Sequence, residues 1–106
     1  MNRISSITVR HILDQFPDTS YLDTEDFQER RQQYETGSFE FIGIRAEAEI
    51  VAGGVCQTIT SGGLWGIESD SAPEYLSEVE EEEIGQLKDI LQSLGFSSKA
   101  IQQRIP

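Results

Sequence analysis

An amphipathic pattern in the last third of the chain constrains the fold more than any other feature. Apolar residues recur there at spacings of three, four and seven, which is typical of one face of an α-helix. They are Leu76, Val79, Ile84, Leu87, Ile90, Leu91 and Leu94. Ser71 and Glu74 fit a capping box at the start, and Gly95 fits a C-terminal cap. The pattern predicts a helix over residues 73–94 that packs on another apolar surface.

The middle of the chain predicts a sheet on which that helix can pack. From Ile42 to Ile50, apolar residues alternate with polar residues or glycine, which is typical of a strand with one buried face. Residues 52–54 predict a tight hairpin. A return strand then begins at Val55, and the glycines within residues 61–63 interrupt it. A further strand is predicted over Ile4–Leu13.

A shorter helix is predicted over residues 24–36, with Thr24 as its cap. Phe27 and Tyr34 give this helix only a thin apolar stripe, so we expect it to lie at the periphery. Phe39 and Phe41 fall on the polar side of the central strand pattern. Either a bulge exchanges the two faces there, or the Phe27/Tyr34 helix covers them.

Together these patterns predict one α+β domain over residues 1–106. We expect an antiparallel sheet of three or four strands packed against one long C-terminal amphipathic helix, with a shorter peripheral helix. No stretch approaches the roughly 18 consecutive apolar residues of a membrane span, and the first 13 residues lack the apolar run of a signal peptide. A cytoplasmic location without membrane contact is therefore expected.

Acidic residues dominate the charge, because 19 Asp and Glu stand against 8 Lys and Arg, for a net charge of −11 at pH 7. Such a protein repels nucleic acid and suits a basic surface on another protein. We expect exposed carboxylates to bind that partner. They are Glu78, Glu81, Glu82 and Glu83, with Glu47 and Glu49 as a secondary patch. The alternative is a solvated surface that serves solubility alone.

Few residues are suited to catalysis or metal binding. Cys56 is the only cysteine and His11 the only histidine, which excludes an intramolecular disulfide and multi-cysteine metal sites. Known nucleophile and calcium-loop motifs are absent from the sequence. We therefore expect no enzyme activity, no catalytic residue, no metal and no cofactor, with Cys56 packed in the structure and His11 satisfied by a partner.

Two alternatives concern other surfaces. The turn at Gly62 and Gly63 could present backbone N–H groups to an anion, which would make the protein a small-molecule binder. The favoured interpretation is a β-bulge that lets Trp65 pack in the core. A structural or assembly role is the other alternative, in which the protein homodimerises through a sheet edge or through the Phe39 and Phe41 side.

Three stretches together resemble a group of small acidic proteins of bacteria, phages and plasmids. They are residues 43–49, residues 59–71 and the end of the acidic helix at residues 94–96. The group has no established activity, so the resemblance implies a recurring fold and a mobile-element setting but no catalytic or binding residue. With the charge, it predicts a non-enzymatic inhibitor or nucleic-acid mimic that blocks a basic nucleic-acid-binding surface of a host defence protein.

Overall fold

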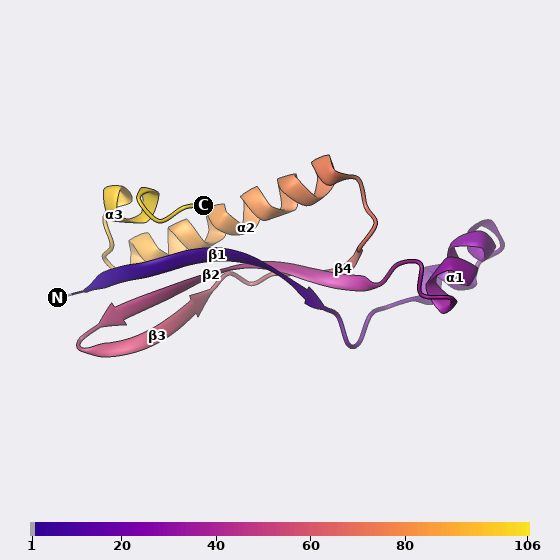
Figure 1. Ribbon diagram of the computed structural model, residues 1–106, viewed down its shortest axis with the longest axis horizontal. Helices are drawn as coiled ribbons and strands as arrows, with labels where there is room; N and C mark the ends of the chain where they lie inside the picture. Colours follow the sequence, from indigo (N-terminus) through magenta and orange to yellow (C-terminus); the bar gives the residue numbers. More distant parts are fainter. Residues whose placement is uncertain (1) are drawn as a thin grey trace.

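The computed structural model describes residues 2–106 and places a long helix across a four-stranded antiparallel sheet (Figure 1). The strands are β1 (Arg3–Leu13), β2 (Phe41–Ala52), β3 (Val55–Thr60) and β4 (Leu64–Glu68). The helices are α1 (Gln28–Glu35), α2 (Pro73–Ser93) and α3 (Ser98–Gln102), and two 3-10 turns are η1 (Ser20–Asp23) and η2 (Glu25–Phe27). The predicted α+β fold, with its antiparallel sheet and long C-terminal helix, is confirmed.

β2 is the central strand and pairs with all three others. β1 runs antiparallel along most of one side of β2. On the other side, β3 pairs with the second half of β2 and β4 with the first half. The return strand is therefore divided in two at residues 61–63, where the glycines predict an interruption. β1 forms one edge of the sheet.

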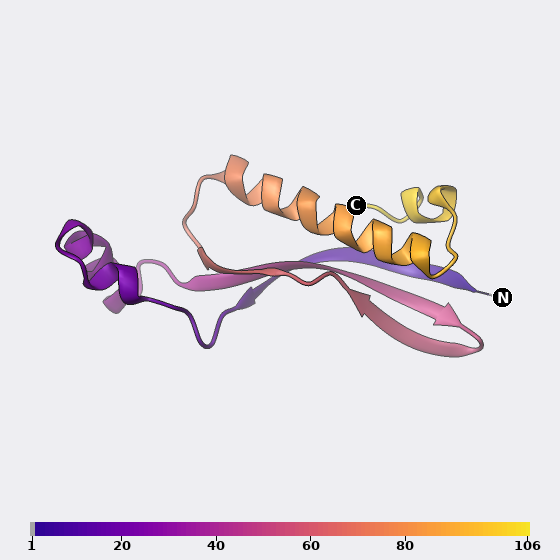
Figure 2. The ribbon, with the colours of Figure 1, turned by 180° about the vertical axis from the view of Figure 1, so that it is seen from behind.

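α2 packs on one face of the sheet, and α3 lies on the same side (Figures 1 and 2). The shared core is aliphatic, because Ala46, Ala48 and Ile50 of β2 meet Leu87 and Leu91 of α2. Alternate residues of a strand point to opposite faces. The residues between them on β2 therefore face away from α2, toward a side of the sheet that no helix crosses in these views.

The two ends of α2 differ in detail from the prediction. Leu94 is exposed and outside the core, because the helix ends at Ser93 and the buried Phe96 packs against Leu91 in its place. Ser71 is wrong as the N-cap, since Ala72 holds that position. The Ser71 hydroxyl instead donates to the Glu68 carbonyl (2.6 Å). The following Pro73 has no N–H to be capped.

The connection from β1 to β2 folds as a small unit at one end of the molecule, which we call the distal unit (residues 14–40; Figure 1). Its core combines Leu22 with aromatic rings: Tyr34 packs against Phe39 and against Phe41 of β2, at ring-centroid distances of 5.7 and 5.0 Å. The prediction that this helix covers Phe39 and Phe41 is confirmed for Tyr34. Thr24 makes no side-chain cap, because its hydroxyl donates to the Tyr21 carbonyl.

The distal unit makes the molecule long. The principal extents are 57 × 25 × 19 Å and the radius of gyration is 17.2 Å. A compact domain of this length has a radius of gyration of about 13 Å. Across residues 2–106, no helix combines the length and the apolar character that crossing a membrane requires.

Candidate functional site

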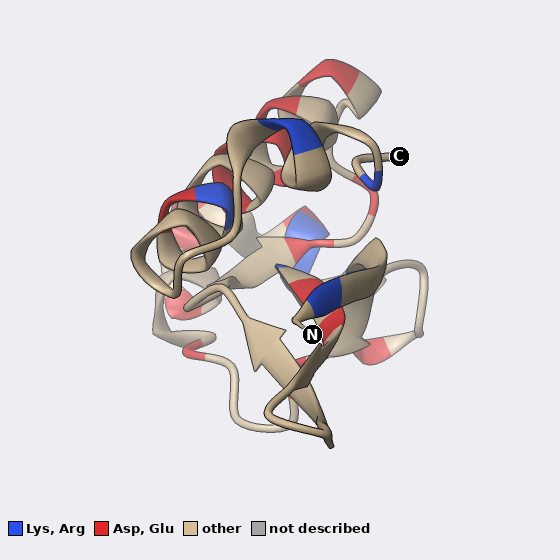
Figure 3. Cartoon of the chain, turned by 90° about the vertical axis from the view of Figure 1, so that its left-hand side faces the viewer, with Lys and Arg blue, Asp and Glu red and all other residues tan. Residues whose placement is uncertain are grey.

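The side of α2 that faces away from the sheet carries a row of carboxylates. Five acidic side chains are exposed there, and we call them the outer acidic face: Glu74, Glu78, Glu81, Glu82 and Asp89. Residues four apart on a helix have Cβ atoms about 5–6 Å apart. At about 1.5 Å of rise per residue, the row from the first to the last of them spans about 22 Å. Figure 3 shows the acidic positions along successive turns of α2.

No ion pair within residues 2–106 involves the outer acidic face. Four of the eight basic residues pair with carboxylates elsewhere: Arg10 and Arg45 with Glu47, Arg30 with Glu68 and Asp70, and Arg31 with Asp23 and Glu35. The outer acidic face therefore keeps its charge, and the carboxylates predicted at Glu78, Glu81 and Glu82 lie where a partner can reach them.

Glu83 is wrong as an exposed binding residue, because it is only 3% exposed. It lies in the buried row of α2, four residues after Val79 and four before Leu87. Its Oε1 accepts hydrogen bonds from the Ser61 hydroxyl (2.7 Å) and from the Gly63 N–H (2.8 Å). A buried carboxylate is tolerated when donors surround it in this way.

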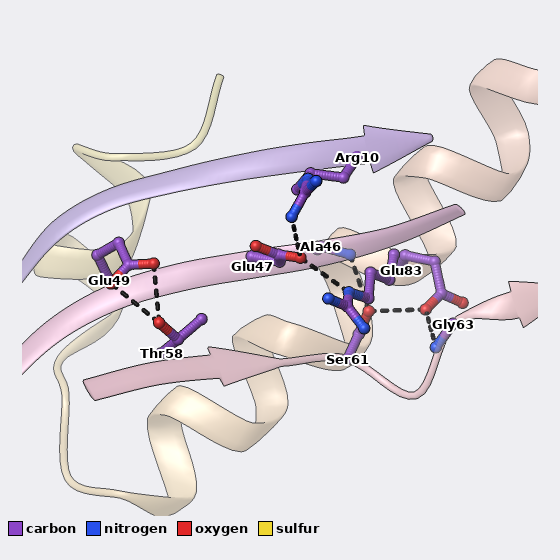
Figure 4. A network of polar contacts seen from close by, with 9 residues as sticks. Arg10, Ala46, Glu47, Glu49, Thr58, Ser61, Gly63 and Glu83 are labelled. Carbon is purple, nitrogen blue, oxygen red and sulfur yellow. Dashed lines mark hydrogen bonds and ion pairs between the residues drawn. The ribbon is translucent and has the colours of Figure 1, made fainter. Parts of the chain in front are cut away.

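The Glu83 carboxylate binds the segment between β3 and β4 (Figure 4). At this point the Ala46 N–H of β2 donates to the Ser61 hydroxyl oxygen (2.9 Å), while the Ser61 N–H donates to the Ala46 carbonyl (2.9 Å). The Ser61 hydroxyl in turn donates a hydrogen bond to Glu83. Glu83 thus joins α2 to the sheet, which is a structural role. Its place in the apolar row was the sequence signal for burial.

The secondary patch is divided by the structure. Glu47 is 8% exposed, so the expectation of an exposed carboxylate is wrong there. It lies on the face of the sheet away from α2, where Arg45 Nε and Arg10 Nη1 approach it at 2.8 and 3.5 Å (Figure 4). Those guanidinium groups offset its charge. Glu49 is exposed and accepts a hydrogen bond from Thr58 (2.9 Å).

Trp65 was predicted to pack in the core, but this prediction is wrong: the side chain is 44% exposed. Its ring lies against Gly43 on the face of the sheet away from α2, and a Cβ at Gly43 would overlap the ring. A bulge is present, but it lies within β4 and not at Gly62 and Gly63 as predicted: between the pairs Ile42–Ile67 and Ile44–Leu64, one residue of β2 opposes two residues of β4. The Gly63 N–H, which an anion would need, already donates to Glu83.

His11 and Cys56 lie far apart. Their partners on β2 are Ile44 and Val51, seven residues or about 23 Å along the strand. Cys56 is exposed, so its predicted packing is wrong: it lies on β3, which no helix covers at that position. His11 Nε2 lies 2.8 Å from Glu80 Oε2 of α2. His11 and Cys56 therefore form no thiol–imidazole pair.

Within the described part of the chain, no group of three or more His, Cys, Asp or Glu side chains lies close enough to hold a metal ion. In comparisons with known proteins, no family, no curated protein and no solved structure matches the chain. The resemblance to proteins of bacteria, phages and plasmids stays a prediction.

Proposed function

We propose that the protein is a non-enzymatic binding protein whose outer acidic face docks on a basic surface of another protein. One observation carries the proposal: the exposed carboxylates of α2 have no basic partner within residues 2–106. Like charges four residues apart on a helix repel by a few tenths of a kcal/mol per pair. A basic partner would remove that repulsion and supply the missing counter-charges.

The rigid placement of the carboxylates supports a more specific form, in which the protein mimics nucleic acid. The buried row of α2 fixes the helix on the sheet, so the charges along its outer side keep a regular spacing. A nucleic-acid strand likewise presents regularly spaced negative charges. The length of the molecule, 57 Å, suits an elongated groove.

The target class that we propose is a nucleic-acid-binding protein of a host defence system, since the resembled group belongs to bacteria, phages and plasmids. The net charge of −11 would steer the protein toward a basic groove and speed their association. Once bound, it would exclude the natural ligand from the groove. Salt screens such an interaction, so affinity falls as ionic strength rises.

A capture experiment with charge-reversed variants tests this proposal. Tagged protein is incubated at low salt with lysate of its source or host, and captured proteins are identified after a salt step. Glu78→Lys/Glu82→Lys reverses two charges of the outer acidic face. Glu25→Lys/Glu29→Lys is the matched control, because both residues are exposed in the distal unit and the net charge changes equally.

We expect the wild type and the Glu25/Glu29 control to capture one basic protein that added duplex DNA displaces. The Glu78/Glu82 variant should lose that capture by about tenfold or more, given that close charge pairs at interfaces couple by 1.5–7 kcal/mol. Equal capture by all three proteins would contradict the proposal. Recovery of the bait alone would instead favour the assembly alternative, which light scattering on the purified protein tests.

A further inference from the structure

β1 offers an open backbone edge. The Asp14 N–H donates to the Phe41 carbonyl (2.9 Å), which places residue 14 in a hydrogen-bonded pair with β2. In an antiparallel ladder such pairs alternate with pairs whose backbone groups point away from each other. From residue 7 to residue 13 of β1, the odd-numbered residues therefore direct their N–H and C=O groups outward. No strand within residues 2–106 pairs with them.

A groove of about 440 Å³ runs beside this edge, between β1 and α2, and we call it the edge groove. Its apolar surface comes from Ile7 and Val9 of β1, from Ile84 of α2 and from Pro106, which follows α3. Glu80 and Glu81 line it from the α2 side. The groove thus combines unpaired backbone groups, apolar contacts and negative charge along one line.

We propose that the edge groove binds an extended, basic segment of another protein, which adds to the sheet as a strand antiparallel to β1. Strand addition takes its affinity from backbone hydrogen bonds and its specificity from pockets for alternate side chains. The groove-facing side chains would combine an aliphatic residue, which contacts Ile7, Val9 and Ile84, with lysine or arginine opposite Glu80 and Glu81.

Charge complementarity selects this occupant. Within residues 2–106, Glu81 has no ion-pair partner, and Glu80 pairs only with the ring of His11. Arg10 is exposed on the opposite face of β1, so the other set of side chains on the added strand should not be basic. The occupant is therefore amphipathic, with its positive charge on the face toward α2. The edge groove shares Glu81 with the outer acidic face but includes neither Glu78 nor Glu82. The inference therefore does not rest on the proposed function.

A labelled heptapeptide provides the probe: Lys, Val and Lys occupy its second, fourth and sixth positions, Thr occupies the others, and both ends are blocked. Fluorescence anisotropy measures its binding to the full protein. In antiparallel pairing, the N–H of the groove-facing valine points to β1, whereas that of the neighbouring threonine points away. N-methylation of the valine should weaken binding by about tenfold, and N-methylation of the threonine by less than about twofold.

Protein variants test the charge. Glu80→Gln/Glu81→Gln should weaken peptide binding severalfold. Glu78→Gln/Glu82→Gln is the matched control, with the same change in net charge on the same helix, and it should bind as the wild type does. That control separates the two ideas, because the capture experiment depends on Glu78 and Glu82. Circular dichroism of each variant shows whether α2 is retained.

Three outcomes would overturn the inference. The first is no saturable binding of the peptide to folded protein. The second is equal binding of the two methylated peptides, which removes strand pairing as the cause. The third is that a second copy of the chain occupies the β1 edge. In that case the protein would be a homodimer that does not bind the peptide, and Val9→Pro would convert it to a monomer. This substitution removes an outward N–H without breaking the β1–β2 ladder.

Discussion

The sheet–helix body and the distal unit are stabilised in different ways. In the body, aliphatic side chains of α2 form a regular buried row on β2. In the distal unit, every residue of α1 is at least partly exposed, and a few aromatic contacts around Tyr34 hold the helix in place. A regular row distributes stability over many contacts, whereas the distal unit depends on individual ones.

The distal unit is joined to the body through polar contacts as well. Arg30 approaches Asp70 at 2.8 Å and Glu68 at 3.3 Å, and its guanidinium lies 3.9 Å from the centroid of the Phe39 ring. The Tyr21 hydroxyl donates to Glu68 (2.8 Å). Burial, together with this carboxylate, raises the pKa of Tyr21 to about 12. Tyr21 therefore stays protonated and keeps donating over the ordinary range of pH.

The largest expected effect is in the body. Leu91 is fully buried in the aliphatic core, so Leu91→Ala should lower the free energy of unfolding by about 2–5 kcal/mol. Urea denaturation followed by circular dichroism measures the loss. Leu94→Ala is the matched control, because Leu94 is exposed, and its effect should stay within about 0.5 kcal/mol. Similar losses of unfolding free energy in the two variants would contradict the view that the buried row of α2, and not its exposed C-terminal end, stabilises the body.

The next effect concerns the buried carboxylate that joins α2 to the broken strand. Glu83→Ala should cost about 1–3 kcal/mol, because it leaves the Ser61 hydroxyl and the Gly63 N–H without their acceptor. Glu83→Gln keeps one oxygen acceptor and should cost less. Glu82→Ala, at the exposed neighbouring position, is the control. A Glu83→Ala protein as stable as the control, by the same denaturation measurement, would contradict the structural role of Glu83.

The body could be predicted from sequence to a large extent, because its elements repeat with a fixed period. Alternation predicted the strand around Ile42–Ile50, and the three-and-four spacing predicted α2. The candidate site was predicted only in part. Glu78, Glu81 and Glu82 lie on the outer side of α2, whereas Glu83, in the same acidic run, points inward. Net charge does not distinguish them, but helical phase does.

What could not be predicted depends on contacts between distant segments. The exposure of Trp65 follows from its position over Gly43 of β2, and Glu47 of β2 is approached by Arg10 of β1. Such pairs are set by strand register, which periodicity alone does not determine. In the distal unit, the sequence left two explanations open for Phe39 and Phe41, and the packing of Tyr34 on both rings decides between them.

A third prediction sharpens the contrast by loosening only the distal unit. Tyr34→Ala removes the aromatic contacts to Phe39 and Phe41, each worth about 0.5–1.5 kcal/mol beyond the buried area. Amide hydrogen exchange in α1 should speed up by about tenfold or more, while exchange in β2 and α2 stays unchanged. Phe16→Ala is the control, because Phe16 is 92% exposed. Equal acceleration in α1 and in β2 would mean that the two regions unfold as one unit.

The smallest expected effect is the pH dependence of the contact between the distal unit and the body. The hydrogen bond from Arg30 holds the pKa of Asp70 below its ordinary value of 3.8. Since the folded-state pKa is the lower one, this pair stabilises the fold above the unfolded value and loses that contribution as pH falls through the folded value. Exposed pairs contribute less than about 1 kcal/mol, so the loss is small.

Hydrogen exchange of α1, compared between wild type and Asp70→Asn, isolates this contribution, because every other carboxylate titrates in both proteins. At neutral pH the α1 amides of the wild type should be the better protected. The difference should shrink as the pH falls below 3.8 and through the lowered pKa of Asp70, where the carboxylate of the folded wild type takes up its proton. A difference that stays constant down to the lowest pH at which both proteins remain folded would show that the charge of Asp70 does not hold the distal unit, and that the aromatic contacts around Tyr34 suffice to keep α1 against the body.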